Sequence, residues 1–516
     1  MRRPTFRTAL FAVASLLALF AAIHAWSRVR ALPELHRRLA AARQQLDLSG
    51  DAAHFDAALL ATEGKQIILL GESHAIAANE DLDLALLRYL HRTAGVRIYL
   101  SESSYAQGCL FNRYFETGDE ELLNAIFAEF RGTPAWTTEH RDFYRRFRAW
   151  NLSLPREQRV RIVGVDVEHQ PRLAIRFLAD LADAAGPAPE AIAATISRLP
   201  SLRADDAQAA RRFAPDLLAS LQQHRAAYQA YLGARYLDFE IVAANLENSN
   251  LFYKDHNKPQ GESVREQAMY ETFRKLYPRF AGERMYGRWG AAHIMQCRVN
   301  GREPFAAMLN RPDSPVAGKV AGIQPIYAHS QGVAPTARGY QIYDASASTP
   351  FLQIFTPVAE GRVTLFHIEG AAALMTRVLP EYPLARGAQY VVLISDSGPN
   401  HPLDATPPAA DDGSAPVVVK TVPASGSRDV SPSVTEIRVT FSKNMARGMS
   451  WVTQGAASFP EIVRAEFVDP RTNVAQVRLK PDHDYVILMN SGRFQNFRDL
   501  AGHPAVPYVL TFHTTR

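Results

Sequence analysis

Five ionisable residues stand just after short apolar runs of the chain, and their side chains suit proton transfer. The first two are Glu72 and His74, which follow the uninterrupted apolar run Ile67 to Leu70. The same order recurs three more times and adds Glu102, Asp166 and His293. Imidazole titrates near neutral pH, and a neighbouring carboxylate can orient the ring and stabilise its protonated form. The set therefore predicts general acid-base catalysis, in which His74 or His293 takes a proton from water that attacks an ester or similar acyl bond.

The same residue types allow other interpretations. Two histidines and two carboxylates, namely Glu72, His74, Glu102 and His293, are a reasonable ligand set for zinc or manganese. Ser73 is a minor candidate for a nucleophile, because no Gly-x-Ser-x-Gly turn surrounds it. A purely structural interpretation makes Glu72 a helix cap and His74 an ordinary loop residue. We take metal-independent hydrolysis as the first hypothesis and a metal site as the second.

Parallel strands would bring the five residues together. The apolar runs suit strands that are covered on both faces, as in a parallel sheet between helices, and they lie at 67–70, 96–100, 160–165 and 285–292. A helical pattern after His74, with Leu82, Leu86 and Leu90 on one face, joins the first two runs into a strand-helix-strand unit. Because the carboxyl ends of parallel strands share one edge of the sheet, we expect the five side chains to converge there. The predicted fold class is α/β, a mostly parallel sheet flanked by helices.

A long helical insertion separates the third and fourth runs. The pattern at about residues 170–284 is almost wholly helical, whereas a crossover between parallel strands needs only about a dozen residues. The insertion leaves the carboxyl edge of the sheet and is placed to act as a substrate lid, although a plain helical layer over the sheet explains it equally well. Later strand-like runs end near His329, His367 and Asp396. These are weaker candidates, because a lone histidine near an apolar run is more often a hydrogen-bonded core or loop residue.

Changes in composition define the domain boundaries. A chain of 516 residues is too long for one typical domain. We place a helical lead-in at 32–60, an α/β domain at 61–400, a linker rich in Pro, Ala and Asp at 401–416, and a last domain at 417–516. The last domain carries short alternating apolar runs between Pro, Gly, Asn and Asp, which is the pattern of a β-sandwich.

The first residues are predicted to address the chain to a membrane. Arg2, Arg3 and Arg7 precede the apolar run Ala9 to Trp26, which is close to the ~20 residues that span a bilayer. We interpret residues 1–31 as a signal or anchor segment and favour an uncleaved anchor, with the rest of the chain exported to the periplasm or cell exterior. Cleavage would instead give a secreted protein.

Charge and cysteine content argue against two classes of protein. The chain has 57 basic and 52 acidic residues and no dense basic run outside the N-terminal region, so nucleic acid is not expected as a partner. With only Cys109 and Cys297, the chain is no disulfide-rich scaffold. Export could oxidise this pair to a disulfide, and two small buried thiols are the equal alternative.

Six landmarks, taken in order, resemble those of the erythromycin esterase-like proteins. They are Leu70-Gly-Glu-Ser-His74, the strand end at Glu102, Phe111-Asn-Arg-Tyr-Phe-Glu-Thr-Gly-Asp119, Val163-Gly-Val-Asp166, the helix from Arg265 to Met269, and Gly290-Ala-Ala-His-Ile294. The broader superfamily includes the haem-binding ChaN-like lipoproteins and the TraB and Tiki-type proteins. The resemblance spans about residues 55–400 and implies an α/β fold with a helical insertion.

The resemblance also implies an active-site cleft that uses Glu72, His74, Glu102 and His293, with Arg265 nearby. We add Asp166 to this catalytic set and assign substrate binding to Arg265 and Asn112. The substrate is expected to be a small molecule, and no cofactor is expected for such a hydrolase. The Tiki-type branch implies a divalent metal instead, and the ChaN-like branch implies haem in a non-catalytic binding protein.

One departure from the family leaves the substrate open. A single residue, Ser73, separates Glu72 from His74, whereas erythromycin esterases have two residues there, and this spacing looks more like the ChaN-like branch. A macrolide is therefore not assumed as the substrate.

The last domain resembles a bacterial Ig-like domain of the SbsA type. The strings that stand in that pattern's order are Val422-Pro-Ala424, Asp429-Val-Ser-Pro432, Val439-Thr-Phe-Ser442, Asp499-Leu-Ala-Gly502 and Thr511-Phe-His-Thr514. We expect this domain to be a spacer or to cover a flank of the catalytic domain, rather than to bind a specific partner.

Overall fold

A computed structural model describes most of the chain. The described residues are 30–48, 55–56, 59–202, 207–255, 258–336, 339–348, 351–380, 384–404, 415–446, 448–453, 455–491, 494–500 and 502–516. They divide into two compact units, one formed by residues up to 330 together with 345–397, the other by 331–344 together with 398–516. Of the expected signal or anchor segment, 1–31, residues 1–29 lie outside the described part. Within the described part, no helix combines the length and apolar character that a bilayer crossing requires.

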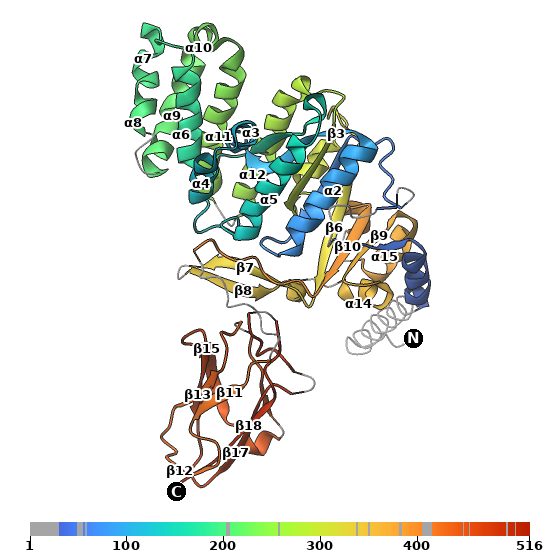
Figure 1. The fold of residues 1–516 in the computed structure, drawn as a ribbon, viewed down its shortest axis with the longest axis vertical. Coiled ribbons are helices and arrows are strands. Elements are labelled where there is room, and N and C mark those ends of the chain that lie inside the picture. The colour runs from blue at the N-terminus through green and yellow to red at the C-terminus, as the bar shows by residue number, and fades with distance from the viewer. Residues whose placement is uncertain are drawn as a thin grey trace, which may run out of the picture. The chain divides into compact units, whose positions relative to one another are not determined.

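The first unit is built on one eight-stranded sheet in the order β1-β9-β10-β6-β2-β5-β3-β4 (Figure 1). The strands are β1 (Arg43–Gln45), β2 (Ile67–Glu72), β3 (Val96–Ser104), β4 (Arg161–Asp166), β5 (Arg284–Gly290), β6 (Val320–Ala328), β9 (Val363–His367) and β10 (Tyr390–Ser395). All neighbours from β10 to β4 pair in parallel, whereas β9 runs antiparallel to β10 and β1 antiparallel to β9. The predicted mostly parallel sheet is confirmed.

The central strands are apolar throughout because helices cover both faces of the sheet. Ile67, Ile68 and Leu69 of β2 are completely buried, as expected for the middle of a parallel sheet. Four helices surround the β2–β4 half of the sheet: α2 (Ala78–Ala94), α3 (Tyr105–Thr117), α4 (Glu120–Ala128) and α5 (Thr138–Leu152). Ser104 and Gln107 form a reciprocal capping box that starts α3 directly at the end of β3.

The helical insertion is present and continues the core of the sheet. Its helices are α6 (Pro171–Asp183), α7 (Glu190–Ile196), α8 (Arg198–Leu202), α9 (Ala207–Gln223), α10 (Arg225–Leu232), α11 (Tyr236–Lys254) and α12 (Pro259–Leu276). Figure 1 shows α6 to α11 gathered at one end of this unit, while α12 returns to the sheet and contacts β4. Four short helices complete the unit: α13 (Phe305–Leu309), α14 (Leu352–Phe355), α15 (Ala372–Val378) and α16 (Leu384–Gly387).

The lead-in at 32–60 is not the purely helical segment that the sequence predicted. Residues 30–41 are helical, but β1 follows and pairs with the edge strand β9. The sequence of β1 is Arg-Gln-Gln, which has no apolar period and therefore does not predict a strand. The segment is a strand because it pairs with the edge strand β9.

The second unit contains two four-stranded sheets and a separate hairpin. One sheet has the order β11-β13-β16-β15 and the other β12-β18-β17-β14, with antiparallel neighbours except β12 and β18. The strands are β11 (Val418–Val422), β12 (Ser427–Val430), β13 (Glu436–Phe441), β14 (Trp451–Thr453), β15 (Glu461–Phe467), β16 (Thr472–Arg478), β17 (Asp484–Met489) and β18 (Tyr508–Thr514). Alternate residues such as Val439, Val477, Ile487 and Leu510 form its core, which confirms the predicted sandwich. The hairpin, β7 (Gln331–Thr336) and β8 (Gly339–Asp344), was not predicted.

Candidate functional site

The predicted acid-base residues lie at the carboxyl ends of four adjacent strands, β2, β5, β3 and β4. Glu72 ends β2 and stands in register with Gly290, the last residue of β5. A Cβ atom added at Gly290 would lie 3.4 Å from Oε2 of Glu102, 3.4 Å from Cδ2 of His293 and 3.6 Å from Cε1 of His74. Gly290 is therefore the point around which these three side chains meet.

Glu72 and His74 form the first histidine-carboxylate pair. The Nδ1–H of His74 donates to Oε1 of Glu72, and the amide of Asn79 donates to Oε2 of Glu72 at 2.8 Å. The hydroxyl of Tyr327 donates to Asn79 at 2.8 Å and accepts the backbone N–H of Ser73 at 3.1 Å. Both oxygens of Glu72 are thus held, while 52% of the His74 side chain remains exposed, so the ring can meet a substrate or water.

The charges of this pair stabilise each other. The Glu72 carboxylate raises the pKa of His74, and this effect exceeds the opposing effect of burial. Burial by itself would raise the pKa of Glu72, but His74 and then Arg288 lower it to about 2. Glu72 is therefore an anion throughout the physiological pH range.

His293 lies between two carboxylates. Its Nδ1–H donates to Oε1 of Glu266 at 2.9 Å, and its Nε2 lies 3.2 Å from Oε1 of Glu102. Only 7% of the His293 side chain is exposed. Burial would lower the pKa of His293, but Glu102 and Glu266 raise it to about 9 against the opposing charge of Arg265. The two carboxylates therefore favour the imidazolium form, which the guanidinium of Arg265, with Nη1 3.2 Å from Nε2 of His293, opposes.

Arg265 joins Glu102 to Asp166. Its Nη2 donates to Oε1 of Glu102 at 2.6 Å and to Oδ2 of Asp166 at 2.5 Å, and its Nε donates to Oδ1 of Asp166 at 3.0 Å. Burial would raise the pKa of both carboxyls, but Arg265, together with His293 at Glu102 and His169 at Asp166, holds them well below their ordinary values. Asp166 is completely buried, and its carboxylate holds the guanidinium of Arg265.

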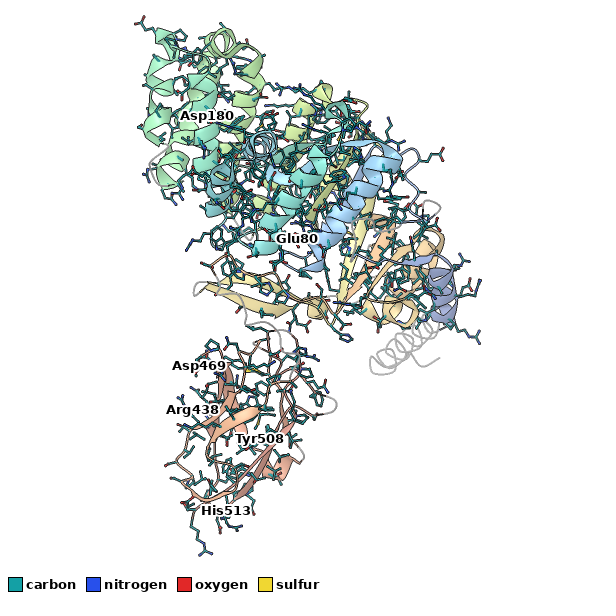
Figure 2. All side chains as sticks on the ribbon, viewed as in Figure 1. Glu80, Asp180, Arg438, Asp469, Tyr508 and His513 are labelled. Carbon is teal, nitrogen blue, oxygen red and sulfur yellow. The ribbon has the colours of Figure 1, made fainter. Side chains whose placement is uncertain are left out.

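Sequence reasoning missed two parts of this site. Glu266 follows Arg265 directly in α12, but a carboxylate on a helix gives no pattern that separates a site residue from a surface one. The second part is Arg288 of β5, whose Nη1 lies 3.1 Å from Oε1 of Glu80 and whose Nε lies 3.2 Å from Oδ2 of Asp83. Figure 2 labels Glu80, which is on α2. Arg288 also lies 3.9 Å from Glu72, so this buried cluster supports the first histidine-carboxylate pair.

Other predicted or weaker candidates lie outside the cluster. The side chain of Asn112 donates to the carbonyl of Ile162 at 2.7 Å and accepts its N–H at 2.9 Å, so its amide holds β4 against α3. His329 and Asp396 are exposed residues 3.8 Å apart at the ends of β6 and β10. His367 is paired with Glu369 at 3.1 Å. Cys109 and Cys297 are not joined in a disulfide.

The donor set fits an arginine-centred ion cluster rather than a metal site. The guanidinium of Arg265 already pairs with Glu102 and Asp166. A metal ion placed between these two carboxylates would be repelled by the positive guanidinium. Among the described residues, no group of three or more His, Cys, Asp or Glu side chains has an arrangement that could hold a metal ion.

Comparison with known proteins agrees with this architecture. Residues 91–286 match the family model described as erythromycin esterase, and residues 412–514 match that of a bacterial Ig-like domain. The first match includes Glu102, Asp166, Arg265 and Glu266 and ends before His293. None of the curated proteins searched matches the chain.

Three solved structures are similar in fold. A Bacillus cereus protein is 14% identical with a TM-score of 0.54, and the match covers 72% of this chain and 99% of that one. A mutant of the erythromycin esterase EreC in its open conformation is 14% identical with a TM-score of 0.53, and the match covers 70% of this chain and 100% of that one. A succinoglycan biosynthesis protein is 13% identical with a TM-score of 0.53, and the match covers 72% of this chain and 98% of that one. At these identities the similarity shows the fold.

Proposed function

We propose that this chain is a hydrolase of an ester or related acyl bond, in which His74 removes a proton from the attacking water. The match to the erythromycin esterase family model supports a hydrolase or ligand-binding role. The observation that favours hydrolysis is the meeting of two carboxylate-held histidines around Gly290, one half-exposed and one buried and cationic.

His74 is the general base in this proposal. Its Nδ1–H is held by Glu72, so the opposite ring nitrogen, Nε2, accepts the proton as the water oxygen bonds to the acyl carbon. Glu72 stabilises the imidazolium that forms. When the tetrahedral intermediate collapses, the bond to the alcohol oxygen breaks and His74 returns the proton to that oxygen.

His293 and Arg265 supply the positive charge. The carbonyl oxygen becomes negative in the tetrahedral intermediate, and a preorganised cation in a site with little water stabilises it. His293 is held as an imidazolium by Glu102 and Glu266, while Asp166 fixes Arg265. Glu102, Glu266 and Asp166 are positioning residues in this mechanism.

A panel of esters, lactones and peptides tests the proposal. We expect His74→Ala to lower kcat/KM for a cleaved ester by at least about 100-fold, because a positioned base contributes 10²- to 10⁴-fold. His513→Ala is the matched control, since His513 forms a similar pair with Asp484 at 2.9 Å in the second unit (Figure 2). A wild-type rate in His74→Ala would refute the proposal. A stoichiometric metal that is lost in His74→Ala and His293→Ala would replace it with the metal-dependent alternative.

We also propose that the protein is exported and anchored by its first residues. The support is the order of Arg2, Arg3 and Arg7 before the apolar run Ala9 to Trp26. Membrane fractionation and mass spectrometry of the mature N-terminus test this proposal. A mature chain that starts near Leu32 would exclude the anchor.

A further inference from the structure

A cavity of about 540 Å³ lies in the helical insertion, between the start of α9 and the end of α11. It is lined by Gln208, Arg211, Arg212, Asn250 and Tyr253. Neither His74 nor His293 lines it, so it is a separate space from the ester-cleaving site. Two of the five described residues that line it are arginines, which gives this wall a positive character.

Among the residues that the structure describes, the guanidinium of Arg211 has only neutral partners. Its Nη1 donates to the hydroxyl of Ser249 at 2.9 Å, its Nη2 donates to the carbonyl of His169 at 3.3 Å, and its guanidinium lies 4.6 Å from the centre of the Tyr253 ring. Burial lowers the pKa of Arg211 against the effect of Tyr253. A partly buried cation that has no anion beside it is costly, and a bound anion relieves this cost.

Among the described residues, no carboxylate forms an ion pair with the arginines of the cavity. In the part of the chain that the structure describes, neither Arg211 nor Arg212 forms an ion pair with Asp or Glu. Glu247 accepts the amide N–H of Asn250 at 2.9 Å, and in the described part of the chain it pairs with neither arginine. Arg212 is exposed at the cavity, where its guanidinium can reach a bound molecule.

The cavity is connected to the acid-base site through hydrogen bonds. The hydroxyl of Tyr253 lies 2.9 Å from Nδ1 of His169, and Nε2 of His169 lies 3.1 Å from Oδ2 of Asp166. Asp166 in turn holds Arg265. Tyr253 therefore belongs both to the wall of the cavity and to the network that positions Arg265.

We propose that this cavity binds a carboxylate or phosphate group of the substrate, which makes the substrate class an acidic ester. The planar fork of a guanidinium matches the oxygens of both anions, and the amide of Gln208 adds a polar group to the wall. This inference rests on the proposed hydrolase function. It adds a recognition site on the insertion, remote from the atoms that react.

Steady-state kinetics with two synthetic esters tests the inference. The probes are the mono-4-nitrophenyl ester of dodecanedioic acid, whose carboxylate lies far from the acyl carbon, and 4-nitrophenyl laurate, which has the same chain length and no carboxylate. We expect Arg211→Gln to raise KM for the dodecanedioate ester by about tenfold or more with little change in kcat, because a charged hydrogen-bonding group is lost, and to leave the laurate ester unaffected. Arg212→Gln gives the same selectivity if Arg211→Gln does not fold. Arg235→Gln, an exposed arginine of the same insertion, is the matched control and leaves both KM values unchanged.

Titration calorimetry of the full chain with succinate and with inorganic phosphate separates the two anions and the two proposals. Binding of either ion that is lost in Arg211→Gln or Arg212→Gln supports the cavity as an anion site, even if no ester is cleaved and the hydrolase proposal fails. The relative affinities of the two ions identify the preferred group. Ester cleavage without preference for the acidic ester, together with no binding of either ion, overturns the cavity and leaves the hydrolase standing.

Discussion

The two histidines of the site differ in exposure and in their carboxylate partners, and these differences separate their roles. His74 is half-exposed beside one carboxylate, whereas His293 is buried between Glu102 and Glu266. A residue that must exchange protons with water needs access to it, and a residue that supplies fixed charge benefits from burial. At the residue scale, these differences are the reason why we propose His74 as the base and His293 as the cation.

The pH dependence of kcat/KM follows from these assignments. The base His74 must be neutral, so activity rises with pH through a pKa that Glu72 raises above 6.5, and it falls again as His293 loses its proton near pH 9. Glu72→Gln removes the anion that raises the pKa of His74, so we expect the acidic limb of the profile to move to lower pH. The alkaline limb in the same variant is the internal control. An acidic limb that stays in place would show that His74 is not the titrating base.

Glu266 is expected to control the alkaline behaviour of the protein. A group whose pKa rises from 6.5 to about 9 on folding contributes stability that is complete below 6.5 and is lost as pH rises through 9. Because the Glu266 carboxylate raises the pKa of His293, we expect Glu266→Gln to shift this loss to lower pH. Thermal unfolding midpoints measured from pH 7 to 10 check the shift. An unchanged profile would mean that Glu266 does not set the charge of His293.

At the scale of elements, the helical insertion contributes to the site directly. Its last helix, α12, carries both Arg265 and Glu266, which contact residues of β3, β4 and the segment after β5. One of the two predicted interpretations made the insertion a layer that only covers the sheet. Because α12 contributes residues to the site, the insertion does more than cover the sheet. Movement as a lid remains a prediction.

Close contact between β3 and β5 is a second feature at this scale. A Cβ atom at Gly287 would lie 1.7 Å from the carbonyl oxygen of Leu100, which is a backbone atom that cannot yield. We expect Gly287→Ala to destabilise the protein by about 3 kcal/mol through forced separation of the strands. Gly370→Ala, which would meet no atom within 4 Å, is the matched control and changes stability by less than about 0.5 kcal/mol. Urea unfolding of the two variants makes the comparison, and equal midpoints would contradict it.

For the whole molecule, the division into two units predicts that activity belongs to the first. All residues of the proposed site lie in the unit that ends at Ser397. We expect a chain truncated after Ser397 to keep kcat/KM for a cleaved ester within about twofold, because no site residue is removed. A large loss of activity in a truncated chain that still unfolds cooperatively would show that the Ig-like unit is more than a spacer.

The sequence by itself determined the central strands and the chemistry at their ends. A strand covered on both faces needs a continuous apolar run, so Ile67 to Leu70 and its counterparts could be located, and the ionisable residue after each run was visible at once. It also indicated the insertion and the sandwich, because helices and half-buried strands have different apolar periods.

The sequence predicted that these side chains converge, but the tertiary structure alone decided how they pair and which charges they carry. The position of β5 between β2 and β3 puts His293 beside Glu102, and the return of α12 to the sheet brings Arg265 and Glu266 to them. Neither arrangement produces a pattern in the local sequence, because strand order and helix docking depend on contacts between segments far apart in the chain. The same reason explains why β1 and the hairpin β7–β8 were not predicted and why Asn112, which looked like a site residue, holds the backbone of β4.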